Sequence, residues 1–122
     1  MIRLWTLGRV DVVDDRGVTI DEVATQSKRL ALLVYLALAE PPGWQRRDTL
    51  VALFWPELDA RRARHALRQA LHFLRTRLGA DAILTRGAED VAIGPAVWCD
   101  AAALGAGAAS PADALALYRG DL

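Results

Sequence analysis

The stretch DARRARHALRQALHFLRTRLG, residues 59–79, has the spacing of one long amphipathic helix. Its apolar residues recur every three or four positions, which places them on one side of a helix. They are Ala63, Leu67, Ala70, Leu71, Leu74 and Leu78. Asp59 belongs to the residue types that cap the start of a helix, and Gly79 to those that follow its end. The sequence therefore predicts a helix over residues 60–78 that buries one apolar stripe.

The other side of this predicted helix is basic. Residues 60–80 contain six arginines and two histidines but no acidic residue. The outward side chains, with Arg64 and Arg75 at the flanks, are Arg61, Arg64, His65, Arg68, Gln69, His72, Arg75 and Thr76. A solvated helix face commonly mixes acids with bases and gains ion pairs between residues four apart. Because this helix cannot form such pairs within itself, we expect its counterpart to be an external anion.

Duplex DNA is an anion that fits a helix of this kind. The major groove admits an α-helix, and Arg, Gln and His side chains supply groups for phosphates and base edges. The alternative is a solvated arginine-rich surface, because 14 of the 15 basic residues of the chain are Arg, a bias typical of GC-rich genomes. That bias alone does not explain the missing acids.

Shorter elements precede the long helix. Residues 2–7, 10–13 and 18–20 have the pattern of strands in a small antiparallel meander, with a turn at residues 14–17. Apolar residues then recur at helical spacing from about Gln26, until Pro41 and Pro42 end the first helix.

A second helix and a hairpin complete the pattern. The second helix is predicted from about Arg46 to Trp55, with Asp48 in its first turn and Pro56 as its stop. Residues 83–85 and 91–93 form a predicted β-hairpin around a five-residue loop. Strands, three helices and a hairpin in this order predict an α+β fold, the winged helix-turn-helix with an N-terminal antiparallel sheet.

The composition is that of a globular protein, and a domain boundary is expected near residue 94. The 122 residues are 53% apolar and 25% charged, which excludes a disordered chain, and the net charge is zero. We expect residues 1–94 to form the first domain. The Ala-rich residues 95–122, with a helical segment near 111–118, are expected to begin a second, helical domain.

A cytoplasmic location is expected. A single cysteine, Cys99, excludes an internal disulfide and suits a reducing compartment. The longest apolar run, residues 30–39, is too short to cross a bilayer, and the N-terminus lacks the pattern of a secretory signal. No membrane partner is therefore expected.

Enzymatic function is not predicted. Ser27 and Ser110 have no base motif nearby, and no glycine-rich phosphate loop occurs. His65 and His72 are seven residues apart, about 10 Å along a helix, so they cannot share one metal ion. We expect neither catalytic residues nor a metal or other cofactor.

Further basic residues accompany the long helix. Lys28 and Arg29 lie at the start of the first helix, and Arg46 and Arg47 at the start of the second. Helix N-termini attract phosphates, so both pairs are candidate contacts to the DNA backbone, although each pair can equally be ordinary surface charge. Arg86 in the hairpin is a candidate wing contact, which the neighbouring Glu89 and Asp90 oppose.

Residues 53–79, LFWPELDARRARHALRQALHFLRTRLG, resemble the second and third helices of the antibiotic-regulatory-protein (SARP) activators, which carry an OmpR-type winged helix-turn-helix. The segments VWCD (97–100) and ALALYRGDL (114–122) are similar to the opening of the bacterial transcriptional activation domain that follows it in that family. The resemblance covers essentially the whole chain.

The resemblance implies a bacterial transcription regulator that inserts its third helix into the major groove, often as a tandem pair on direct repeats. Matching the helix ending implies DNA contacts at His65, Gln69, His72 and Arg75, with Arg68 adjacent. It also implies that the loop before that helix touches RNA polymerase, here through Trp55, Pro56, Glu57 and Leu58. The second domain would be tetratricopeptide-like, and a homodimer on DNA is a further expectation.

The hairpin departs from the family. Its wing often ends in a Gly-Tyr-x-Leu pattern, whereas this chain has Asp90-Val91-Ala92-Ile93. The missing aromatic residue and the added acids argue against a wing contact to DNA. Two other functions stay open, namely a winged-helix protein-interaction module without DNA binding and the output module of a larger signalling protein.

Overall fold

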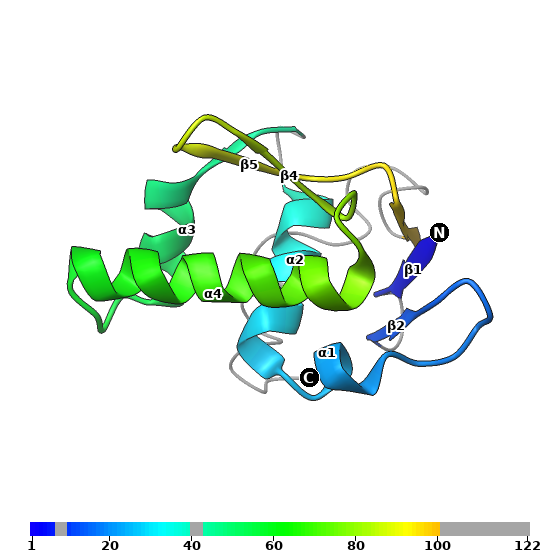
Figure 1. Ribbon diagram of the computed structural model, residues 1–122. Coiled ribbons are helices and arrows are strands. Elements are labelled where there is room, and N and C mark those ends of the chain that lie inside the picture. Colours follow the sequence, from blue (N-terminus) through cyan, green and yellow to red (C-terminus); the bar gives the residue numbers. More distant parts are fainter. Residues whose placement is uncertain (7–9, 40–42, 101–122) are drawn as a thin grey trace.

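Helices and strands both build this protein, which is a mixed α+β fold (Figure 1). The computed structural model describes residues 1–6, 10–39 and 43–100. Their elements are β1 (Ile2–Trp5), β2 (Asp11–Val13), α1 (Asp21–Ala24), α2 (Ser27–Leu38), β3 (Gln45–Arg46), α3 (Arg47–Phe54), α4 (Ala60–Leu78), β4 (Ile83–Arg86), β5 (Asp90–Ile93) and β6 (Val97–Cys99). The described residues thus contain four helices, one more than predicted.

The first sheet has the strand order β2-β1-β6. The antiparallel pairing of β1 with β2, in which Leu4 faces Val12, confirms the predicted start of the meander. Its predicted third strand is reduced to a single bridge between Val13 and Thr19. β6, which was not predicted, pairs in parallel with the other edge of β1. This strand follows residue 94, where a second domain was expected to begin, and residues 101–122 of that expected domain lie outside the described residues.

The second sheet, ordered β3-β5-β4, contains the predicted hairpin. Its loop is shorter than the predicted five residues, because Arg86 and Asp90 pair directly across the strands. Gly94 follows the hairpin at a close approach of two backbone segments. Its N–H donates to the Ala82 carbonyl at 2.7 Å, and a Cβ at this position would lie 1.8 Å from the Asp81 carbonyl oxygen. Glycine is therefore the residue that fits there.

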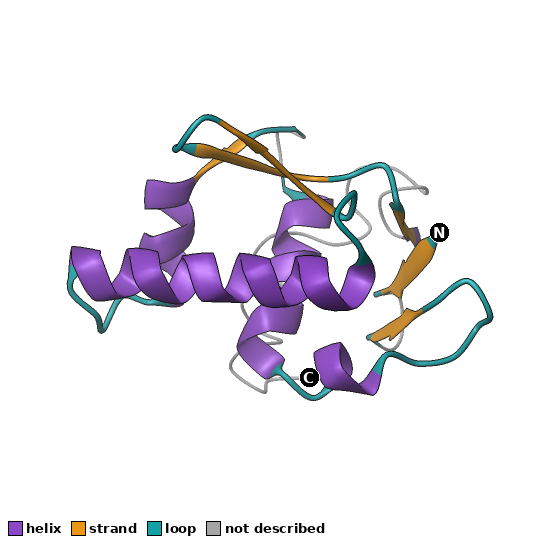
Figure 2. Cartoon of the chain, in the orientation of Figure 1, coloured by secondary structure: helices purple, strands orange, loops and turns teal. Residues whose placement is uncertain are grey.

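The long helix α4 runs along the front of the molecule in Figure 1, with α2 and α3 behind it and the β4–β5 hairpin above. Figure 2 shows the same view with the helices in purple and both sheets in orange. Apolar side chains from three helices meet beneath α4, and Leu33, Leu50, Phe54, Leu67 and Leu74 are fully buried there. The core thus fixes α4 by one side and leaves the other side toward solvent.

The bounds of α4 agree with the prediction, and so does its cap. The Asp59 side chain accepts a hydrogen bond from the backbone N–H of Arg62 at 2.9 Å, and Gly79 follows the helix with a φ of 110°. Residues 47–54 and 27–38 are helical near the predicted second and first helices. The short α1 was not predicted, because four residues are too few for a helical period to be read.

Replacing the cap tests how much it stabilises α4. Asp59→Ala is expected to lower the free energy of unfolding by about 1 kcal/mol, because one N–H of the first turn loses its acceptor. Urea unfolding followed by circular dichroism measures this loss. Asp59→Asn is the matched control, because asparagine caps helices as well as aspartate does. An Asn variant as unstable as the Ala variant would show that the exposed ion pair of Asp59 with Arg62, and not the cap, stabilises the helix start.

The described residues contain neither a helix that could span a membrane nor a cluster of side chains that could hold a metal ion. None of their helices combines the length and the apolar character that a membrane span needs. Nor do they bring together three or more His, Cys, Asp or Glu side chains in a group that could hold a metal ion. Cys99 is buried, as expected for a small apolar side chain.

Candidate nucleic-acid interface

Helix α4 has one buried and one exposed side, as its sequence predicts. The six apolar residues of the predicted stripe are the buried residues of the helix. Of the predicted outward side chains, Arg61, Arg64, His65, Arg68, Gln69, His72 and Thr76 are exposed, and only Arg75 is half-buried. The structure therefore leaves a row of basic and amide groups open to solvent along the helix.

Arg64 has carboxylates beside it that the sequence of the helix does not contain. Its guanidinium forms an ion pair with Asp48 of α3 and lies 3.9 Å from Glu89 of the hairpin loop. The expectation that this basic face has no internal counter-ions is wrong at Arg64, because the acids come from other elements. All three side chains are about half exposed, so the pairs are solvent-screened. Arg64 therefore links α4 to α3 and to the hairpin.

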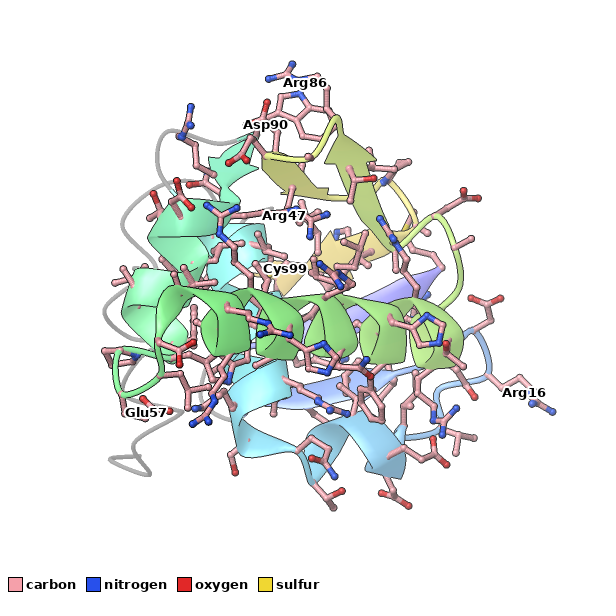
Figure 3. All side chains as sticks on the ribbon, turned by 60° about the vertical axis from the view of Figure 1, so that its left-hand side comes forward. Arg16, Arg47, Glu57, Arg86, Asp90 and Cys99 are labelled. Atoms are coloured by element: carbon pink, nitrogen blue, oxygen red, sulfur yellow. The ribbon has the colours of Figure 1, made fainter. Side chains whose placement is uncertain are left out.

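Arg75 and Arg47 lie at the edge of α4 that faces the hairpin. The Nε–H of Arg75 donates to the carbonyl oxygen of Ile83 at 3.2 Å, which joins the end of α4 to β4. Arg47 opens α3, and its backbone N–H donates to the Glu89 carbonyl at 2.8 Å. Figure 3 shows Arg47 between α4 and the hairpin strands.

The electrostatic environment of Arg47 is positive. Burial lowers the pKa of its guanidinium, and the nearby charges of Arg75 and Arg68 lower it further. Glu89 opposes that shift, and Arg64 adds a smaller effect in the same direction as the other arginines. The Nε atom of Arg47 is buried and has no hydrogen-bond partner among the residues that the structure describes. Arg47 is therefore held in a positive environment at the edge of α4 that faces the hairpin.

The start of α2 lies at the opposite edge of α4. Lys28 Nζ is 3.4 Å from Glu57 Oε1 and 5.3 Å from the centre of the Trp55 ring. The pKa of Glu57 is held below its ordinary value, first by a hydrogen bond from its own backbone N–H and then by Lys28. Figure 3 shows Glu57 on the other side of α4 from the hairpin tip. Lys28 thus binds the loop between α3 and α4.

Arg29 also contacts α4 itself. Its guanidinium lies 4.4 Å from the centre of the Phe73 ring, and Arg77 approaches the same ring at 5.4 Å. A phenyl ring that carries two guanidinium groups was not anticipated from the sequence. In the sequence, Phe73 stands out only because it is an aromatic residue among basic positions of the helix, which does not indicate these two contacts.

At the hairpin tip, Arg86 is paired with an acidic residue of the same hairpin. Arg86 forms an ion pair with Asp90 at 3.1 Å and lies 4.5 Å from the centre of the Trp44 ring (Figure 3). Both contacts hold Arg86 against the sheet, which agrees with the expectation that acids in this loop oppose a wing contact. Arg46, in β3, is exposed and pairs through its backbone with Asp90.

Residues 55–58, where a polymerase contact was expected, include both buried and exposed side chains. Trp55 is only 7% exposed and its ring lies 6.2 Å from that of Phe54, so it belongs to the core. Pro56 and Glu57 are exposed, and Leu58 is half-buried. A shallow, mainly apolar hollow lies beside this turn, lined in part by Val51, Ala52, Trp55, Pro56 and Leu58.

The predicted basic residues thus divide into three groups. The outward side chains of α4 are exposed, Arg47 and Arg75 are half-buried on the flank toward the hairpin, and Lys28, Arg29 and Arg86 contact neighbouring side chains. No local sequence pattern indicated that Asp48 and Glu89 would be counter-ions, because both are distant in the chain from Arg64. Family models, curated proteins and solved structures all gave no match to this chain.

Proposed function

We propose that this chain is the sequence-specific DNA-binding part of a transcription regulator with a winged helix-turn-helix fold. In this proposal α4 is the recognition helix and enters the major groove, and the β4–β5 hairpin is the wing. The single observation that carries the proposal is the exposed side of α4, which presents basic and amide side chains without an acidic residue of its own. Such groups suit both phosphates and base edges.

The direction of the side chains assigns their roles. His65, Gln69 and His72 are exposed on the side of α4 opposite its buried stripe, so we assign them to base edges. Arginines at the two flanks are assigned to the phosphates of the two strands. The resemblance to SARP activators supports the same arrangement, and it suggests direct repeats, a homodimer on DNA and an RNA polymerase contact at residues 55–58. No catalytic step is part of this proposal.

Selection of binding sites from a pool of random DNA duplexes tests the proposal. The folded protein is expected to enrich one short sequence motif, because base-edge contacts distinguish the four base pairs in the major groove. The matched control is a variant with His65, Gln69 and His72 all replaced by Ala, which should enrich no motif while it keeps its fold. A wild-type protein that is folded and enriches no sequence contradicts the proposal.

Phosphate contacts make a separate prediction about salt. Arg68→Ala is expected to reduce the slope of log affinity against log salt concentration by about 0.9, the effect of one lost phosphate contact. Fluorescence anisotropy at several salt concentrations measures the slope. Arg16→Ala removes an equal charge from the turn after β2, outside the face of α4, and should leave the slope unchanged (Figure 3). Equal slopes for Arg68→Ala and wild type would place Arg68 off the DNA backbone.

A protein-interaction module is the second candidate function. The observation that favours it is the pairing of Arg64 with Asp48 and Glu89, which shows that carboxylates can satisfy part of this face. A net charge of zero is also compatible with a protein partner. In that case α4 would dock on an acidic protein surface, and the folded chain would not bind DNA even at low salt.

A further inference from the structure

The outward face of the first sheet carries two tryptophan rings. The side chains of β1 alternate between the core and this outward face, and Arg3 and Trp5 point outward. Trp98 of β6 is the register partner of Arg3, which places its ring on the same face. The rings of Trp5 and Trp98 meet edge to face, with their centres 5.2 Å apart. The sheet therefore has one side in the core and one aromatic side that no helix of the core covers.

The two rings line a shallow hollow that is open to solvent. Met1, Arg3, Trp5 and Trp98 surround a volume of about 270 Å³, which is mainly apolar. Trp5 is 39% exposed and Met1 is 61% exposed, and few other large apolar side chains of the described residues are exposed to this degree. Exposed apolar patches mark surfaces that bind other proteins, and tryptophan and arginine often dominate such contacts. The hollow therefore has the composition of a protein-binding surface.

This surface is separate from the one that we propose for DNA. In Figure 1 the sheet with β1 and β2 lies at one end of the molecule, and the turn between α3 and α4 lies at the other end. The exposed basic side chains belong to α4, whereas the tryptophans belong to β1 and β6. A protein partner on the sheet and DNA on α4 would therefore contact different parts of the chain.

Charges of both signs flank the apolar centre of the hollow. Arg3 is exposed and forms no ion pair with another residue that the structure describes. Asp15, in the turn after β2, contacts the backbone amine of Met1 at the rim of the hollow, and its side chain is 74% exposed. A second face of the same composition would offer each of these charges an opposite charge, and each apolar side chain an apolar neighbour. The face is thus complementary to itself.

We infer that this face binds the same face of a second copy of the chain, in a dimer with twofold symmetry. Identical surfaces meet in such a dimer, so every contact occurs twice. The Trp5 and Trp98 rings of both copies bury one another at the centre, and Arg3 of each copy pairs with Asp15 of the other copy. Because the contact is small, the dimer is weak and forms only as the protein concentration rises.

The dimer goes beyond the proposed function and does not rest on it, because it forms without DNA. It also differs from the head-to-tail pair on direct repeats that the resemblance suggests, since a head-to-tail pair joins two different faces. A failure to dimerise in solution and a failure to bind DNA are therefore separate results.

Sedimentation equilibrium of the full chain over a wide range of concentrations tests the dimer. The mass of the wild type is expected to rise from that of one chain toward that of two. Trp5→Lys should weaken the association about tenfold or more, because it removes a central ring and adds a positive charge beside Arg3. Trp44→Lys is the matched control, because Trp44 is 38% exposed and lies outside this face. This control should associate as the wild type does.

An exchange of charges tests the pairing between the two copies, and it applies even if Trp5→Lys does not fold. Arg3→Glu and Asp15→Lys should each weaken the dimer, because each places like charges opposite one another. The double variant, with both changes, should restore the association. A wild type that keeps the mass of one chain at every concentration would overturn the dimer and leave this face to a different partner. So would folded Trp5→Lys and Arg3→Glu variants that associate as strongly as the wild type, or a double variant that associates no more strongly than the single variants.

Discussion

Phe54→Ala is expected to lower the free energy of unfolding by about 3–5 kcal/mol, the largest loss of stability that we predict. Phe54 is fully buried at the end of α3, where its ring lies 5.8 Å from that of Tyr35 in α2, edge to face. Removing the ring leaves a cavity beneath α4 and takes away its aromatic contacts. Urea unfolding followed by tryptophan fluorescence and circular dichroism measures the loss.

The control for this variant is Val18→Ala, because Val18 is 57% exposed. It is expected to change the free energy of unfolding by no more than about 0.5 kcal/mol. A total stability of about 5–15 kcal/mol is usual for a domain, so the loss expected for Phe54→Ala is a substantial part of the total. A loss of less than about 1 kcal/mol for Phe54→Ala would show that α2, α3 and α4 are not packed around this ring.

Gln69→Ala is expected to weaken binding to the selected DNA sequence by about 5- to 150-fold, or about 1–3 kcal/mol. Gln69 is exposed on the outward side of α4, and a glutamine amide can donate one hydrogen bond and accept another at the edge of one adenine. An alanine at this position cannot replace them. Anisotropy titration with the selected duplex measures the change.

A shuffled duplex of the same composition is the control for Gln69→Ala. Because glutamine carries no charge, the variant should bind the shuffled duplex as the wild type does, with the same salt dependence. This pattern distinguishes a lost base contact from the lost phosphate contact expected for Arg68→Ala. Equal weakening on both duplexes would mean that Gln69 does not read a base.

The sequence was sufficient to predict α4 and its two sides. A period of 3.6 residues over 19 positions, a capping Asp59 and a terminal Gly79 are local signals, and they gave the bounds that the structure has. The strands β3 and β6 were not predicted. They have only two and three residues, and each forms through pairing with a strand distant in the chain. Local sequence patterns do not predict pairing between strands that are distant in the chain.

The candidate site was predictable in composition but not in its contacts. The helical spacing of the sequence placed Arg64 and Arg75 at the flanks of α4, yet their different environments depend on which elements pack beside each flank. Arg64 meets carboxylates from α3 and from the hairpin loop, whereas Arg75 meets a backbone carbonyl of β4. The division between open, paired and half-buried arginines therefore emerges only from tertiary structure.

The most direct test of the account is an anisotropy titration of the wild-type chain at two salt concentrations. The duplexes are DNA from upstream of the gene and a shuffled control. We predict tight binding to the upstream duplex at low salt, weaker binding at high salt and a clear preference over the shuffled duplex. No binding to either duplex at low salt, by a protein that circular dichroism shows to be folded, would contradict the proposal that α4 reads DNA.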